Sequence, residues 1–162
     1  MRVPFRDLRV VDVQERRQLW QIYANAIDHG QLIGGNHVRV FEREFASTVN
    51  RQHCVAVANG TAAIHIAMRA LGIGEGHKVI TTPLSWISTA TAVLETGAEL
   101  TFVDVDRHGN ICAEQVASLL TDQFSAVLAV DYFGRIADLP LLEDHCRTVG
   151  VPLVEDAAQS AG

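Results

Sequence analysis

The sequence has 162 residues, 48% of them hydrophobic, and a formal net charge of −6. A chain of this length buries about 70% of its unfolded surface, which is enough for one compact domain with a core. It contains no apolar run near the roughly 18 residues of a membrane span, no apolar signal-peptide core at its start and no basic cluster. We therefore expect a soluble, cytoplasmic protein that binds neither nucleic acid nor a membrane.

The first 51 residues have a helical pattern. Apolar residues at helical spacing over 11–28 predict an amphipathic helix, and Gly30 is placed to end it. Residues 31–35 form a predicted loop, after which Asn36 is expected to cap a second helix. We interpret 1–51 as an N-terminal helical segment that precedes an α/β domain over 52–162.

From residue 52 onward, short apolar runs alternate with helical patterns. Strands are predicted at 54–58, 78–82, 100–103, 126–130 and 152–155, and helices at 61–71, 85–96, 113–120 and 139–149. Asp138 is expected to cap the last helix, with Pro140 in its first turn. The alternation predicts an α/β three-layer sandwich, in which helices cover both faces of a mostly parallel sheet.

Metal and disulfide chemistry have little support in the residue spacing. The three cysteines, Cys54, Cys112 and Cys146, are scattered and form no CxxC pair, which is typical of reduced thiols. The seven histidines are dispersed too, so we expect no metal site. Asp104 and Asp106 follow a predicted strand, and we expect them to form a turn rather than an acid–base pair or a metal site.

The segment Ala-Asn-Gly-Thr-Ala over 58–62 follows a predicted strand and opens a helix. Gly60 lets the backbone approach a ligand, and the amides of Thr61 and Ala62 are expected to be free at the positive end of the helix. This combination is suited to binding a phosphate group. The alternative is an ordinary helix start that Asn59 caps.

Two further residues at the ends of predicted strands are suited to a planar ligand. Trp86 follows the strand at 78–82, where its indole could stack on a flat ring or pack a helix onto the sheet. Asp156 follows the strand at 152–155, where its carboxylate could hold a protonated heteroaromatic nitrogen or cap a helix that starts at Ala157.

Together, the phosphate site, the aromatic side chain and the acid predict a site for pyridoxal 5′-phosphate. This cofactor has a phosphate, a flat ring and a ring nitrogen that needs a carboxylate partner. All three groups follow predicted strands, and open α/β sheets bind ligands at the carboxyl ends of their strands. A nicotinamide cofactor would need a glycine-rich loop after the first strand, where only Asn59-Gly60-Thr61 occurs.

Four ordered motifs, at 59–63, 70–74, 102–106 and 155–159, carry a resemblance to a known family. From residue 3 to its end, the sequence resembles the N-terminal part of the DegT/DnrJ/StrS family of pyridoxal-phosphate-dependent nucleotide-sugar aminotransferases. The resemblance implies a partial large domain of the type I fold, whose C-terminal remainder lies outside this sequence.

The resemblance also implies a set of cofactor-binding residues: Gly60, Thr61, Ala62, Trp86, Asp156 and Gln159. The first three hold the phosphate in the family, and the aromatic residue stacks on the ring. The acid binds the ring nitrogen, and the glutamine lies near the ring hydroxyl. The segment 32–35 resembles a loop near the sugar-nucleotide site.

The family's Schiff-base lysine follows the acidic motif, at a position beyond Gly162. The only lysine of this sequence is Lys78, which we expect at the exposed start of a strand. We therefore expect no catalytic residue in this chain, which would be inactive alone. Asp131 stands where many family members carry histidine, and we assign it no role.

The implied activity is transfer of an amino group from glutamate to a nucleotide-linked keto-sugar, in polysaccharide or antibiotic biosynthesis. The resemblance implies a homodimer in the full-length form, with each site completed by the neighbouring subunit. Two alternatives stay open: a sugar dehydratase of the same fold and cofactor, and a non-catalytic binding or assembly module.

Overall fold

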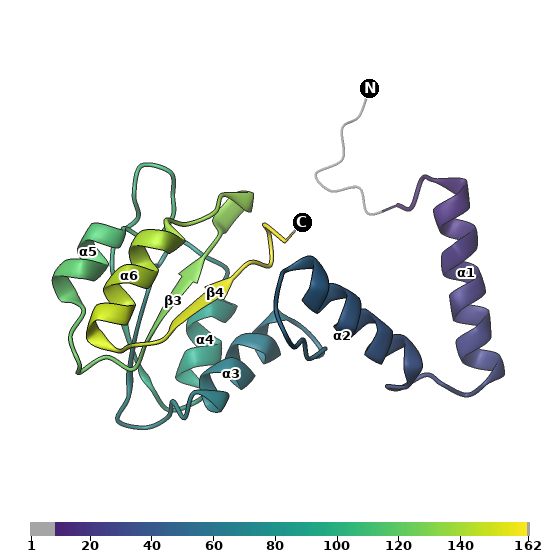
Figure 1. Ribbon diagram of the computed structural model, residues 1–162, viewed down its shortest axis with the longest axis horizontal. Coiled ribbons are helices and arrows are strands. Elements are labelled where there is room, and N and C mark those ends of the chain that lie inside the picture. Colours follow the sequence, from purple (N-terminus) through teal and green to yellow (C-terminus); the bar gives the residue numbers. More distant parts are fainter. Residues whose placement is uncertain (1–8, 162) are drawn as a thin grey trace. The chain divides into compact units, whose positions relative to one another are not determined.

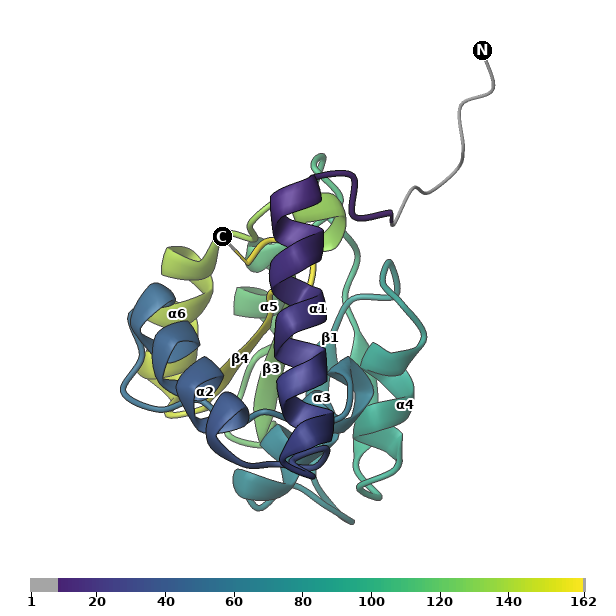
Figure 2. The ribbon, with the colours of Figure 1, turned by 90° about the vertical axis from the view of Figure 1, so that its right-hand side faces the viewer.

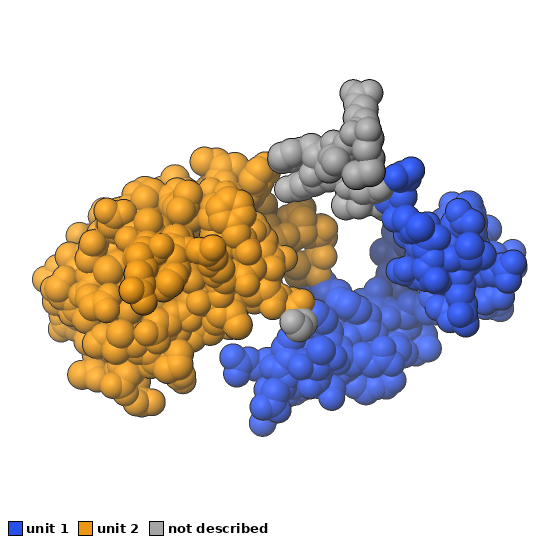
Figure 3. All heavy atoms as spheres, turned by 90° about the horizontal axis from the view of Figure 1, so that it is seen from above, with its two compact units in different colours: residues 1–56 blue, residues 57–162 orange. Residues whose placement is uncertain are grey.

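The structure is a computed structural model that describes residues 9–161. The segment 3–8, with which the resemblance begins, and Gly162 lie outside the described residues. The chain divides between Ala56 and Val57 into two compact units, which are coloured blue and orange in Figure 3. The domain division at 51/52 stays a prediction.

The first unit begins with helix α1 (Val13–Asp28). Asp12 caps it by accepting the N–H of Glu15 at 2.7 Å. Gly30 follows the end of the helix with a φ of +63°, a conformation that suits glycine at a helix stop. The predicted helix over 11–28 is thus confirmed, with a start two residues later.

Helix α2 (Asn36–Thr48) follows the loop at 31–35. The expected cap of this helix is wrong, because Gly35 is the N-cap residue and Asn36 is already helical. Gly35 has a φ of +84°, which glycine adopts at low cost, so the helix starts without a side-chain cap.

The second unit is built on a parallel sheet with the strand order β2–β1–β3–β4, and Figure 1 shows β3 and β4 side by side. The strands are β1 (Lys78–Thr81), β2 (Glu99–Phe102), β3 (Ala126–Val130) and β4 (Leu153–Asp156). Each of them lies within one residue of a predicted strand at both ends. Four of the five strand predictions are therefore confirmed.

The fifth prediction, a strand at 54–58, is wrong. Residues 54–57 have no regular secondary structure, and Val55 is 74% exposed. A strand needs the backbone of a neighbour to satisfy its N–H and C=O groups, and no strand within 9–161 pairs with this segment. The apolar residues of this segment alone could not show that, within residues 9–161, no neighbouring strand pairs with it.

The helices of the second unit are α3 (Gly60–Ala70), α4 (Ser88–Leu94), α5 (Ala113–Leu119) and α6 (Leu139–Val149), with a 3₁₀ turn η1 (Tyr132–Gly134). The predicted bounds of α6 match, and Asp138 caps it by accepting the N–H of Leu141 at 3.3 Å. Helix α4 is shorter than its predicted range of 85–96.

Alternate strand residues divide the core into two layers. Val79 and Leu128 pack with residues of α3 and α4, whereas Ile80 and Val127 pack with residues of α5 and α6. All four side chains are fully buried. Figure 2 shows α4 and α6 on opposite sides of the strands. The three-layer α/β sandwich predicted from the sequence is confirmed.

The order of the strands makes one edge of the sheet suitable for a ligand. From β1 the chain crosses through α4, on one face, to β2; it then returns through α5, on the other face, to β3. The carboxyl ends of β1 and β3 therefore flank a topological switch point, where open α/β sheets bind ligands.

Over residues 9–161, no helix combines the length and apolar character that crossing a membrane would require. The three cysteines are all free thiols.

The thiol of Cys146 is expected to react more slowly than those of Cys54 and Cys112. Cys146 is 2% exposed, and its burial raises the pKa of the thiol above the ordinary value of 9.0, whereas the other two are half-buried. Because only the thiolate reacts, a chromogenic disulfide reagent at pH 8 should modify Cys146 at least about tenfold more slowly. Cys146→Ser should leave the rates at which Cys54 and Cys112 react unchanged.

The raised pKa of Cys146 also predicts a change of stability with pH. The free energy of unfolding should fall as the pH rises above 9, because the thiol ionises first in the unfolded chain.

Candidate cofactor site

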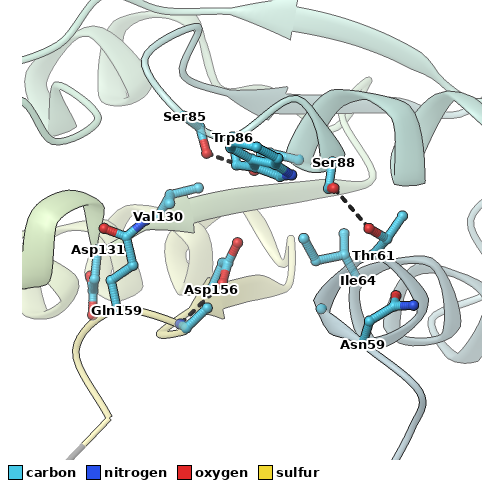
Figure 4. Close-up of a pocket in the computed structure, with 13 residues that line it drawn as sticks. Asn59, Thr61, Ile64, Ser85, Trp86, Ser88, Val130, Asp131, Asp156 and Gln159 are labelled. Atoms are coloured by element: carbon cyan, nitrogen blue, oxygen red, sulfur yellow. Dashed lines mark hydrogen bonds between the residues drawn. The ribbon is translucent and has the colours of Figure 1, made fainter. Parts of the chain in front are cut away.

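A pocket of about 290 Å³ lies at the carboxyl ends of β1, β3 and β4 (Figure 4). Its walls come from the start of α3, the loop between β1 and α4, the end of β3 and the segment after β4. Five of the six predicted cofactor-binding residues line it: Gly60, Thr61, Trp86, Asp156 and Gln159. Residues far apart in the sequence thus meet in one cavity.

The start of α3 offers unpaired backbone donors. The N–H groups of Gly60 and Thr61 occupy the first turn and have no acceptor among residues 9–161. A Cβ atom built on Gly60 would have no heavy atom within 4 Å, so space is open beside these amides. The hydroxyl of Thr61 donates to Oγ of Ser88 at 2.7 Å, which leaves the Ser88 hydroxyl hydrogen free for another acceptor.

The expectation of a free amide at Ala62 is wrong. Its N–H donates to Oδ1 of Asn59 at 2.9 Å, and Ala62 does not line this pocket. Asn59 therefore caps α3, as the alternative interpretation held, and the phosphate-sized space beside Gly60 is present as well. A capped helix start and an anion site are compatible here, because the cap uses one amide and leaves two.

Trp86 lies in the loop between β1 and α4 and is 69% exposed. This exposure contradicts the alternative in which the indole packs a helix onto the sheet. Ser85 and Thr89 share a hydroxyl hydrogen bond of 2.7 Å, which joins the loop to the first turn of α4. The indole is thus held at the pocket wall with an open face.

Asp156 ends β4, and its carboxylate points toward Trp86 in Figure 4. One oxygen, Oδ1, accepts the N–H of Ala158 at 3.2 Å, and within the described chain Oδ2 has no partner. Residues 158–160 form a turn and no helix begins at Ala157 within the described residues, so Asp156 caps a turn there rather than a helix. The second oxygen is available to a ligand.

Gln159 contacts the turn after β3. Its Oε1 accepts the N–H of Phe133 at 2.8 Å. Because a backbone N–H is a donor, the amide must turn its oxygen toward Phe133, and the NH₂ group is left to donate elsewhere.

Sequence reasoning missed Asp131, Ser85 and Ser88, all of which line the pocket. Asp131 is 1% exposed and directly follows β3. The sequence did contain a signal for Asp131, because this acid directly follows an apolar strand, much as Asp156 stands at the end of β4. The two serines gave no signal, since their roles depend on hydroxyl contacts across the loop.

The charges of the lining residues are negative. Two carboxylates, Asp131 and Asp156, line the pocket, and no Lys, Arg or His residue does so among those described. Among the described residues, the groups that favour an anion are the amides and the positive end of α3. Affinity for a cationic ring can come from Asp156.

Lys78 lies at the opposite end of β1 from the pocket. It begins the strand, is partly exposed, and its Nζ lies 3.7 Å from a carboxylate oxygen of Glu99. Four strand residues span roughly 10 Å, so the sequence's only lysine is remote from the ends of the strands that form the site.

The remaining predictions concern residues outside the pocket. Asp106 accepts the N–H groups of His108 and Asn110, which confirms a turn. Within 9–161 no group of three or more His, Cys, Asp or Glu residues could hold a metal ion. The segment 32–35 belongs to the other compact unit, and its link to a sugar-nucleotide site stays a prediction.

Comparisons with known proteins place this architecture in context. The model of the DegT/DnrJ/EryC1/StrS aminotransferase family matches residues 13–162. A curated relative from Geobacillus stearothermophilus, described as a pleiotropic regulatory protein, is 32% identical over 163 residues, which is all of this chain and 44% of the relative.

Solved structures agree with the family match. S. venezuelae DesV, in complex with a ketimine intermediate, is 34% identical with a TM-score of 0.95 over 99% of this chain and 44% of its own. NtdA from Bacillus subtilis, with bound cofactor PMP, is 25% identical with a TM-score of 0.93 over 99% and 37%. DesI, in the presence of its TDP-sugar product, is 31% identical with a TM-score of 0.79 over 91% and 38%. The chain thus spans less than half the length of these relatives.

Proposed function

Because this chain belongs to the DegT/DnrJ/EryC1/StrS aminotransferase family, we propose that it forms the cofactor-binding part of a pyridoxal-phosphate-dependent sugar aminotransferase. The amino donor would be glutamate, and the acceptor a keto-sugar linked to a nucleotide. The TDP-sugar product of DesI and the cofactor PMP of NtdA support this choice of ligands.

One observation carries the proposal: an open space beside free helix amides, an exposed indole and a carboxylate with a free oxygen occur in a single pocket. Its volume of about 290 Å³ lies near the lower end of the range for small-molecule sites, which suits a compact cofactor. The residues present therefore fit pyridoxal phosphate.

Each side of the cofactor has a partner in this chain. The amides of Gly60 and Thr61 would hold the phosphate, since an anion at a helix start is stabilised by the free N–H groups and the helix dipole. Trp86 would cover one face of the ring and keep water from it. When bound, the cofactor supplies an electron sink for amino transfer.

The polar groups beyond Trp86 would set the charge of the ring. The carboxylate of Asp156 would keep the ring nitrogen protonated, because a nearby opposite charge favours the charged form. The NH₂ group of Gln159 would donate to the ring hydroxyl.

We further propose that the 162-residue chain does not catalyse the reaction alone, because its only lysine lies at the far end of β1. The whole enzyme would be a homodimer whose sites the neighbouring subunit completes. The dehydratase and binding-module alternatives stay predictions, since no residue of this pocket distinguishes them.

The experiment is a titration with pyridoxamine 5′-phosphate (PMP), whose amine cannot form an imine with Lys78. Trp20 and Trp86 are the two tryptophans, so Trp20→Phe leaves Trp86 as the only indole. We expect saturable one-to-one quenching of its fluorescence, and no turnover of glutamate with keto-sugar nucleotides. Absence of saturable quenching would contradict the proposed site. The inactivity is tested separately with pyridoxal phosphate, whose aldehyde can react with a lysine: a stoichiometric imine at Lys78 that supports turnover would contradict it.

A further inference from the structure

The turn after β3 and the turn after β4 are joined side by side. The N–H of Asp131 donates to the backbone oxygen of Asp156 at 3.1 Å, which extends the β3–β4 pairing beyond the strands. The N–H of Phe133 donates to Oε1 of Gln159, and the Ser160 hydroxyl donates to Oδ2 of Asp131 at 2.6 Å. Two residues of the cofactor site, Asp156 and Gln159, thus lie on a segment held along its length.

Asp131 is the centre of this arrangement. Its side chain accepts two hydrogen bonds, at Oδ1 from the N–H of Ala137 at 2.9 Å and at Oδ2 from Ser160. A carboxylate this deeply buried is tolerated only where hydrogen bonds replace its lost water. The two oxygens of Asp131 therefore connect Ala137, which lies just before α6, to Ser160 in the turn after β4.

The turn after β3 is also constrained in its backbone. Phe133 has a φ of +58°, which few non-glycine residues adopt, although the residue is 77% exposed and its ring contacts only that of its neighbour Tyr132 among the described aromatic rings. A Cβ atom at Gly134 would lie 3.1 Å from the backbone oxygen of Gln159. The close approach of the two turns thus depends on the glycine, and an uncommon backbone conformation beside it is typical of a positioned functional site.

We propose that Asp131 is a positioning residue for the cofactor and acts through Ser160. By holding the turn at 157–160, it keeps the free oxygen of Asp156 and the NH₂ group of Gln159 directed at the ring. This inference rests on the proposed function, because the two held groups are those assigned to the ring nitrogen and the ring hydroxyl.

Ser160→Ala tests the proposal, because it removes one bond to Asp131 and does not alter a residue assigned to the cofactor. In the Trp20→Phe background we expect PMP to bind about tenfold more weakly, and we expect a lower Tm as well, because the buried Asp131 carboxylate loses one of its two donors. Ser160→Thr keeps the hydroxyl and should restore the affinity. Ser118→Ala removes a hydroxyl bonded to Gln115 in α5 and should change nothing.

A second measurement reports on the turns themselves. In Ser160→Ala, hydrogen exchange at the N–H groups of Phe133 and Ala137 should become faster, while exchange in the centre of β3 stays unchanged. Unaltered exchange and unaltered PMP affinity would overturn the inference alone. If the unsubstituted chain shows no saturable binding, the proposed function fails, and the inference fails with it, since positioning requires a ligand.

Discussion

Substitution of Gly60 by valine is expected to abolish PMP binding without lowering the Tm. A Cβ atom at this position meets no protein atom within 4 Å, so the larger side chain enters the space assigned to the phosphate rather than the protein core. The phosphate would lose two charge-assisted hydrogen bonds from the helix amides. We expect this loss to weaken PMP binding by at least about a hundredfold. The measurement is the Trp86 fluorescence titration in the Trp20→Phe background, with thermal unfolding followed in parallel.

A smaller substitution at the same residue provides the matched control. Gly60→Ala adds one methyl group and should weaken binding less than valine does, and replacing a helical glycine should keep or raise the stability. If valine at residue 60 leaves the PMP affinity unchanged, the phosphate does not bind at the start of α3. A fall in Tm would instead show that the space beside Gly60 belongs to the packed protein.

Asp156→Asn is expected to weaken PMP binding by about ten- to a hundredfold, because hydrogen bonds to charged groups contribute roughly 1.5–3 kcal/mol. Asparagine keeps an Oδ1 atom for the N–H of Ala158, so the turn after β4 should persist. It removes the negative charge that would stabilise the protonated ring nitrogen. The affinity is measured by the same titration, and circular dichroism checks the fold.

Asp104→Asn serves as the control for Asp156. Asp104 follows β2, accepts the N–H of Val105 at 2.8 Å, and does not line the pocket. Both variants change the net charge equally, so a general electrostatic effect would weaken binding in both. Equal affinities for Asp156→Asn and the unsubstituted chain would show that this carboxylate does not face the ring nitrogen.

Local sequence patterns predicted the elements that local forces suffice to form. The apolar run at 126–130 became β3, and Asp138 with Pro140 marked the start of α6 at the right residue. Helix α4 was predicted to start three residues too early, and Ser85 and Trp86 lie instead in the loop that lines the pocket. There the Ser85 hydroxyl is hydrogen-bonded to that of Thr89, which ties the loop to the first turn of the helix.

The sequence by itself determined the α/β architecture, four of the strands and five of the residues that meet in the pocket. It could do so because residues close together in the chain set the side-chain periodicity of helices and strands. Once the strands are known to be parallel, the residues that follow them are expected at one edge of the sheet, where ligands bind. Only the tertiary structure decided that 54–58 is unpaired, that the amide of Ala62 is used by Asn59, and that Asp131 holds the turn after β4. Each of these depends on where a donor and an acceptor come to lie in space, and hydrogen-bond pairing between distant residues has no period in the sequence.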